Sequence, residues 1–180
     1  GRVGYTKAAS FGIGQTSAEH IVLMHPDVEV CYNWLPSLFE ALESCKNHAV
    51  VGPLSNSAGY QSVPNVPDVF DDLRANARPK DMSLKDMCRV VSKASPRDFP
   101  DATLLEGFLL LFKRSVFDIV NGFDATNFPN GLGEHDFLLR VQNIGYTLAI
   151  ADNTYAYHHH ATDMARAHAV NLVLESIRTT

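Results

Sequence analysis

Two short stretches place potential metal ligands at the ends of predicted strands. The stretch "LMHPDVEV" puts Asp27 directly after an apolar run, and "YAYHHHATD" ends another run in His158, His159 and His160. A carboxylate at the end of a buried strand is a ligand for hard cations such as Mg²⁺ or Mn²⁺, and a neutral imidazole also binds metals. Because ligands of open α/β sheets bind outside the strand ends, these residues suggest one divalent-cation site.

Both features also have simpler interpretations. Asp27 can cap the turn that follows its strand, and histidines at a strand end are often plain surface. Because side chains alternate along a strand, at most two of the three histidines share a face. A metal hydrolase is a further hypothesis, but the histidine run and the separate His168 supply its usual ligand spacing poorly.

Two acids open a predicted helix behind the stretch "NGLG". The helix dipole and capping favour acids at this place, which explains Asp136 without any chemistry. Glu134 differs because it follows Gly131 and Gly133, which allow another group to approach the backbone closely. A carboxylate there, at the mouth of a cleft, can act as a general base. The alternative is a first-turn acid that only steadies its helix.

The elements that must position these residues alternate between strands and helices. Short apolar or β-branched runs predict strands at 20–25, 49–53, 103–114, 147–152 and 154–159. Amphipathic stretches predict helices at 5–17, 33–46, 83–93, 134–144 and 162–178, a short helix is predicted at 115–123, and a polar loop spans 54–68. This alternation predicts an α/β fold with a largely parallel sheet, in which helices 33–46 and 134–144 cover the faces.

The composition fits one domain over residues 1–180. The chain is 46% hydrophobic and has a formal net charge of −5 without a basic stripe, which argues against a nucleic-acid partner. Its longest apolar stretch, 107–112, is too short to span a bilayer. The three cysteines are widely spaced and form no CxxC, so reduced thiols in a cytosolic setting are expected rather than a disulfide framework.

Four stretches together resemble family 2 glycosyltransferases of the GT-A fold. They are "GYTKAASFGIGQTSAEHIVLMHPDVEV", "VVGPLSNSAGYQSVP", "LEGFLLLFKRSVFDIVNGFD" and "GLGEHDFLLRVQNIGYTLAIADNTYAYHH", and they cover nearly all of residues 4–163. The second is similar to a loop of the branch that builds bacterial rhamnose-containing and other surface polysaccharides. The resemblance implies a GT-A-like, mostly parallel sheet. It also implies a metal-assisted, inverting transfer of a sugar from a nucleotide-sugar donor to a saccharide acceptor.

The resemblance also implies roles for individual residues. Asp27 and His158 match ligands of a Mg or Mn ion that neutralises the leaving diphosphate. Glu134 matches the base that takes a proton from the acceptor hydroxyl, and Gly107 and Phe108 match the wall beside the acceptor. The other residues expected to contact donor or acceptor are His25, Asn56, Gly133 and Asp136.

Three features depart from the family pattern. His25 stands where the family has the first acid of its D-x-D motif, and Ser10 stands where many members have Asn. The family's N-terminal strands and helices, roughly half of a nucleotide-binding unit, have no counterpart before Gly4. The chain is therefore expected to be the C-terminal portion of a GT-A domain, incomplete at its N-terminus and inactive or very weak. The alternative function is a non-catalytic carbohydrate- or partner-binding module on a GT-A remnant.

The resemblance also sets the expected surroundings of the protein. The expected location is the cytoplasm, at the inner face of the membrane where the full-length enzyme associates peripherally with it. A missing N-terminal half would leave an unpaired strand edge or an apolar surface, which a homodimer partner would cover.

Overall fold

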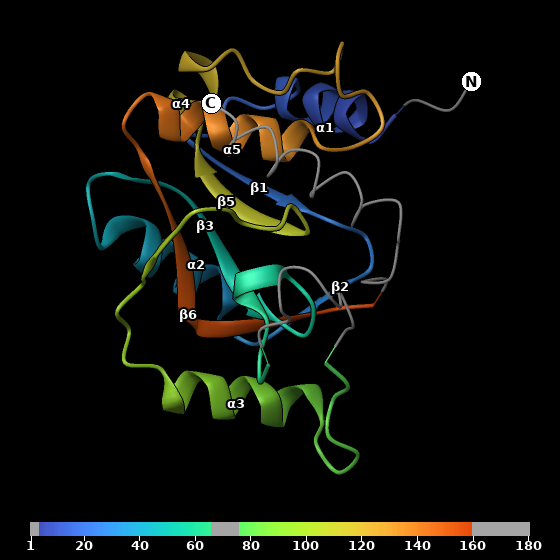
Figure 1. The fold of residues 1–180 in the computed structure, drawn as a ribbon, viewed down its shortest axis with the longest axis vertical. Helices are drawn as coiled ribbons and strands as arrows, with labels where there is room; N and C mark the ends of the chain where they lie inside the picture. The colour runs from blue at the N-terminus through green and yellow to red at the C-terminus, as the bar shows by residue number, and fades with distance from the viewer. Residues whose placement is uncertain (1–3, 66–75, 160–180) are drawn as a thin grey trace, which may run out of the picture.

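The computed structural model describes residues 4–65 and 76–159, which form a six-stranded sheet flanked by helices (Figure 1). The order across the sheet is β1 (His20–Met24), β5 (Leu109–Lys113), β3 (His48–Ser55), β6 (Thr147–His158) and β2 (Val28–Val30). The short strand β4 (Asp101–Ala102) pairs with β6 outside this order. The predicted neighbourhood of β1, β5 and β3 is confirmed, and the class is α/β.

The sheet is mostly antiparallel, so the prediction of a mostly parallel sheet is wrong. Among the described strands, β3 and β6 run parallel, whereas β1–β5, β3–β5, β2–β6 and β4–β6 are antiparallel pairs. The prediction assumed that each helix returns the chain to the same end of the sheet. Instead, the long connection from β3 to β5 passes through α3 (Leu84–Ala94), which packs against β6, and enters β5 from the opposite end.

Helices α2 (Trp34–Glu43) and α5 (Gly133–Asn143) cover opposite faces of the sheet, as predicted. Successive strand residues point to opposite faces. Accordingly, Val50 and Phe112 belong to the core cluster of α5, whereas Val51 and Leu111 belong to the cluster of α2. The helices contribute fully buried apolar side chains to these clusters: Leu38, Ala41 and Leu42 from α2, and Phe137, Leu138 and Val141 from α5.

The other helices agree with the sequence at slightly different limits. Helices α1 (Tyr5–Gly14) and α4 (Arg114–Ile119) share the core cluster of α5, and η1 (Gly59–Gln61) lies in the predicted loop. At the start of α3, a capping box forms between Ser83 and Asp86, and the hydrogen bond from Ser83 lowers the pKa of the Asp86 carboxyl. Within the described residues, no helix has the length and apolarity needed to cross a membrane. The helix predicted at 162–178 lies outside them.

Two predicted strand regions have different limits in the structure. β5 begins only at Leu109, because Gly107 and Phe108 form a turn, and the buried Leu105 lies before this turn in an irregular segment. The strands predicted at 147–152 and 154–159 are one strand, β6, whose pairing with β3 jumps from Ala151 to Tyr155. Such an irregularity re-aims a strand. Figure 1 shows the resulting sharp bend, which directs the end of β6 toward β2.

Cys31 and Cys88 form a disulfide, so the prediction of reduced cysteines is wrong. Their Cα atoms lie 5.7 Å apart although 57 positions separate them in the sequence, and Cys45 is free and exposed. No spacing pattern indicates this pair, because the proximity of the two cysteines depends on the packing of α3 against β6.

Candidate metal-binding site

Three residues proposed from the sequence meet at one point of the structure. His25, Asp27 and His158 each offer a ligand atom, and these atoms all lie within 4.8 Å of one another. His158 Nε2 lies 3.4 Å from Asp27 Oδ1. Each histidine is 6% exposed, whereas Asp27 is partly exposed, so solvent reaches the cluster on the carboxylate side.

Two antiparallel pairings bring these ligands together. The β1–β5 ladder continues beyond its last strand pair, because the His25 N–H donates to the Phe108 carbonyl at 2.8 Å. In the β2–β6 pairing, Val28 lies opposite His158. Since Asp27 directly precedes β2, the turn between β1 and β2 holds it beside the end of β6.

Asn56 fixes the backbone of His158. Its Nδ2 donates to the His158 carbonyl at 3.1 Å, and its Oδ1 accepts from the His158 N–H at 2.8 Å. The β3–β6 pairing ends at Ser55, so this buried amide continues the ladder with side-chain atoms. The resemblance implied a donor or acceptor contact for Asn56. In the structure its side-chain amide is instead hydrogen-bonded to the backbone of His158, a candidate metal ligand.

We expect Asn56→Ala to lower the free energy of unfolding by about 1–3 kcal/mol, because the buried N–H and C=O of His158 lose their shared partner. Urea unfolding at neutral pH measures this difference. Asn47→Ala is the matched control, since Asn47 is exposed and surface changes cost within about 0.5 kcal/mol. Equal values for the two variants would contradict the role given to Asn56.

Aromatic rings surround the two imidazoles. The Phe108 ring stacks on His158 with centroids 5.2 Å apart, and the Tyr5 ring meets His25 edge-on at 5.0 Å. The two imidazole centroids are 5.5 Å apart. These rings limit the orientations of the histidines and keep water from part of the cluster, which strengthens its electrostatic interactions. Sequence reasoning placed Phe108 near the site but missed Tyr5, which no spacing pattern links to a strand end.

Glu134 lies against the backbone at Gly107. A Cβ atom added to Gly107 would lie 2.3 Å from Glu134 Cγ, so the glycine permits this close contact. Gly107 precedes Phe108, which stacks on His158, so the turn before β5 links the carboxylate to the cluster. The sequence predicted Glu134 at the mouth of a cleft, whereas the side chain is buried, with 2% exposure. The contact with Gly107 accounts for this difference.

Gly133 and Asp136 face other parts of the fold. A Cβ atom at Gly133 would lie 2.4 Å from Thr6 Cγ2, so α1 fills the space that the sequence assigned to a sugar. Asp136 Oδ2 accepts hydrogen bonds from Arg140 Nη2 at 2.6 Å and from Nε at 2.9 Å. Arg140 also donates to the carbonyls of Val120 and Gly122, which ties α5 to the end of α4. These contacts give both positions a packing role.

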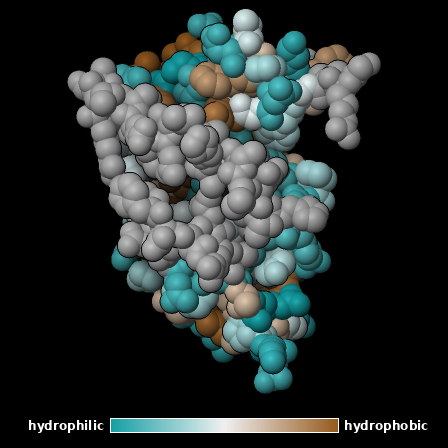
Figure 2. Space-filling model, turned by 45° about the vertical axis from the view of Figure 1, so that its right-hand side comes forward, coloured by the Kyte–Doolittle hydropathy of each residue, from teal (hydrophilic) through white to brown (hydrophobic). Residues whose placement is uncertain are grey.

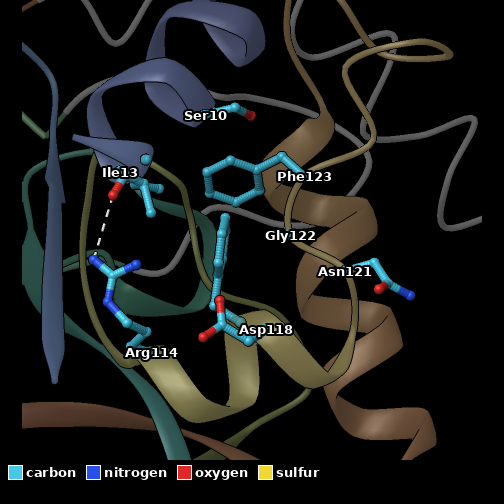
Figure 3. A pocket seen from close by; sticks show the side chains of 9 residues that line it. Ser10, Ile13, Arg114, Asp118, Asn121, Gly122 and Phe123 are labelled. Carbon is cyan, nitrogen blue, oxygen red and sulfur yellow. Dashed lines mark hydrogen bonds between the residues drawn. The ribbon is translucent and has the colours of Figure 1, made fainter. Parts of the chain in front are cut away.

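A pocket of about 320 Å³ lies apart from this cluster, between α1, α4 and the segment after α4 (Figure 3). Arg114 closes one side by donating from Nη2 to the Ile13 carbonyl at 3.4 Å, the contact drawn as a dashed line. The Phe123 ring and the Ser10 hydroxyl are also seen at the pocket in this view. None of its lining residues belongs to the set that the sequence proposed for donor, acceptor or metal.

Comparison with known proteins finds similarity in structure. The fold is similar to the crystal structure of GalNAc-T7 with UDP, GalNAc and Mn²⁺, with a TM-score of 0.58 and 13% sequence identity. The match covers 87% of this chain but 30% of that chain. No protein-family model matches the sequence, and a search of curated proteins finds no match either. At this identity the likeness shows the fold alone, which is GT-A-like with a mixed sheet.

Proposed function

We propose that this chain carries the metal- and acceptor-binding portion of a glycosyltransferase, which transfers a sugar from a nucleotide-diphosphate sugar to a saccharide acceptor. The observation that supports this most is the meeting of His25, Asp27 and His158 within 4.8 Å, at the end of β1, the start of β2 and the end of β6. The likeness to GalNAc-T7, a structure that contains UDP, GalNAc and Mn²⁺, agrees with this function. The motif resemblance to family 2 glycosyltransferases supports it independently of the fold.

The ligands at the cluster fit Mn²⁺ better than Mg²⁺. Mg²⁺ binds through oxygen ligands, whereas the cluster offers two imidazoles and one carboxylate. Imidazole nitrogen suits transition ions, and carboxylate oxygen suits Mn²⁺ as well as Mg²⁺. We therefore propose that His25, Asp27 and His158 hold Mn²⁺. When bound, such an ion neutralises the charge that develops on a leaving diphosphate.

Glu134 is the proposed general base. As the acceptor oxygen bonds to the anomeric carbon and the bond to the diphosphate oxygen breaks, the Glu134 carboxylate would take the hydroxyl proton. Displacement from the opposite face makes the reaction inverting. Phe108 and the turn at Gly107 would form the wall beside the acceptor, next to both Glu134 and His158.

A non-catalytic carbohydrate- or partner-binding module is the second candidate. The burial of Glu134 and the packing of Thr6 into the space at Gly133 favour it, because both leave little room for an acceptor beside the carboxylate. On this view the chain binds a carbohydrate or another partner without transferring sugar.

Titration of Mn²⁺ into the chain in the presence of UDP tests the proposed metal site. We expect electron paramagnetic resonance to show Mn²⁺ binding that Mg²⁺ displaces only in large excess. Asp27→Asn should weaken Mn²⁺ binding at least about tenfold, because loss of even an outer-shell partner commonly costs 10–100-fold. Glu29→Gln is the matched control, since Glu29 is exposed on the neighbouring strand β2. Unchanged Mn²⁺ binding by Asp27→Asn would rule out the site.

A further inference from the structure

The Cys31–Cys88 disulfide attaches the strand that follows Asp27 to helix α3. β2 has three residues, and Cys31 comes directly after its last one. Among the described strands, β2 is an edge of the sheet and pairs with β6 alone. Cys31 is 5% exposed and is bonded to Cys88 of α3. The disulfide is therefore a second attachment for a strand that has one hydrogen-bonded neighbour.

Helix α3 packs on the sheet through a small apolar cluster of its own. Its side chains Met87 and Val91 meet Cys31 and Tyr155, apart from the two main core clusters. Burial raises the pKa of Tyr155 to about 12, so its phenol is neutral in this cluster. Figure 1 shows α3 at the lower end of the molecule, where Figure 2 shows hydrophobic and hydrophilic atoms side by side. The disulfide thus adds a covalent bond to the small apolar contact between α3 and the sheet.

Strand β2 connects the disulfide with the candidate metal site. Its first residue, Val28, pairs with His158, and the His159 N–H donates to the Asp27 carbonyl at 3.1 Å. β2 is thus held along its three residues by its ladder with β6, and the disulfide adds an attachment directly after its last residue. Short edge elements with few buried contacts open at low free-energy cost. Release of the Cys31 end would loosen the turn that carries Asp27.

We propose that the Cys31–Cys88 disulfide is a redox-sensitive positioning device for Asp27, an inference that rests on the proposed metal site. A dithiol reductant attacks one sulfur as a thiolate and forms a mixed disulfide. Its second thiolate then displaces the protein sulfur, so the reductant is oxidised to its own disulfide and Cys31 and Cys88 become thiols. In the oxidised chain Asp27 stays beside His158. In the reduced chain β2 and Asp27 move more freely, and the affinity for Mn²⁺ falls.

The test compares the oxidised chain with Cys88→Ala, well below the melting temperature of either. Electron paramagnetic resonance should show about tenfold weaker Mn²⁺ binding by Cys88→Ala. Hydrogen exchange should be faster at Glu29, because the bond from His159 to Asp27 makes the next alternate pair, Glu29 and Tyr157, a hydrogen-bonded pair of the ladder. Thiol titration in denaturant should find one thiol in the oxidised chain and three after reduction. Cys45→Ala, at the exposed free cysteine, is the matched control and should change neither the Mn²⁺ affinity nor the exchange.

A second variant separates positioning from general stability. Met87→Ala removes an apolar contact of α3 but keeps the disulfide, so it should lower the melting temperature while preserving the Mn²⁺ affinity. Equal Mn²⁺ affinity in the oxidised chain and Cys88→Ala, or three thiols without reductant, overturns the proposal. If the oxidised chain binds no Mn²⁺, the proposed function fails. The exchange at Glu29 then decides the structural coupling, and exchange that is unchanged by reduction overturns it.

Discussion

Glu134→Gln should reduce sugar transfer by about two to four orders of magnitude, the usual span for one general base. The rate of transfer is measured with the smallest polypeptide that contains residues 1–180 and transfers sugar from a nucleotide-sugar donor. Glutamine keeps the shape of the side chain but does not take up a proton at neutral pH, so the acceptor hydroxyl loses its base. Mn²⁺ binding should stay unchanged, because Glu134 is outside the cluster of His25, Asp27 and His158.

Stability measured on the same variant separates catalysis from packing. Glu134 is buried against Gly107, so a purely structural carboxylate would alter the melting temperature and leave the rate per folded molecule nearly normal. Glu43→Gln, at an exposed position of α2, should change neither quantity. A near-normal rate for Glu134→Gln would end the catalytic role of Glu134, and another residue would then have to take the proton.

The sequence was most informative where a buried run ends in a polar residue. Asp27 comes shortly after the short strand β1, and His158 is the last residue of β6, so few directions remain for either side chain. The strand ends made both residues candidate ligands, and the resemblance to family 2 glycosyltransferases then implied that they meet at one ion, with His25 near them. Apolar packing on both faces of the sheet could also be predicted, because alternating residues such as Val50 and Val51 must pack against different helices.

Contacts between elements distant in the chain could not be predicted in the same way. The direction of β5 depends on the path through α3, and the disulfide depends on where α3 packs. The double hydrogen bond of Asn56 replaces a strand pairing that no local pattern encodes. Gly133 was assigned to a sugar because glycine allows a close approach, but the approaching group is Thr6 of α1. A glycine in a sequence indicates that something comes close without indicating what.

Gly107→Ala should disturb both stability and transfer. The added Cβ would lie 2.3 Å from Glu134 Cγ and 2.9 Å from Oε1, and both atoms belong to a buried side chain with little freedom to move. Overpacking of this kind costs about 1–3 kcal/mol, and a displacement of about 1 Å at a catalytic group can cost 100-fold in rate. We therefore expect loss of stability in urea unfolding and about a hundredfold slower transfer in the active polypeptide.

Gly12→Ala is the matched control, for which the free energy of unfolding should rise instead of fall. Its Cβ would meet no atom within 4 Å, so alanine should stabilise α1 by about 0.5–1 kcal/mol.

A double-mutant cycle with Glu134→Ala tests whether the glutamate is the cause of this sensitivity. Glu134→Ala removes Cγ and the carboxylate, so it removes the atoms that the alanine at position 107 would meet. Residues in contact show coupling energies of about 0.5–3 kcal/mol in such cycles. Gly107→Ala should then cost markedly less stability in the Glu134→Ala background than in the wild-type chain. Backbone strain predicts the same cost in both backgrounds, but Gly107 is not among the glycines with positive φ. Additive costs would therefore show that the contact between Gly107 and Glu134 does not hold the proposed base in place.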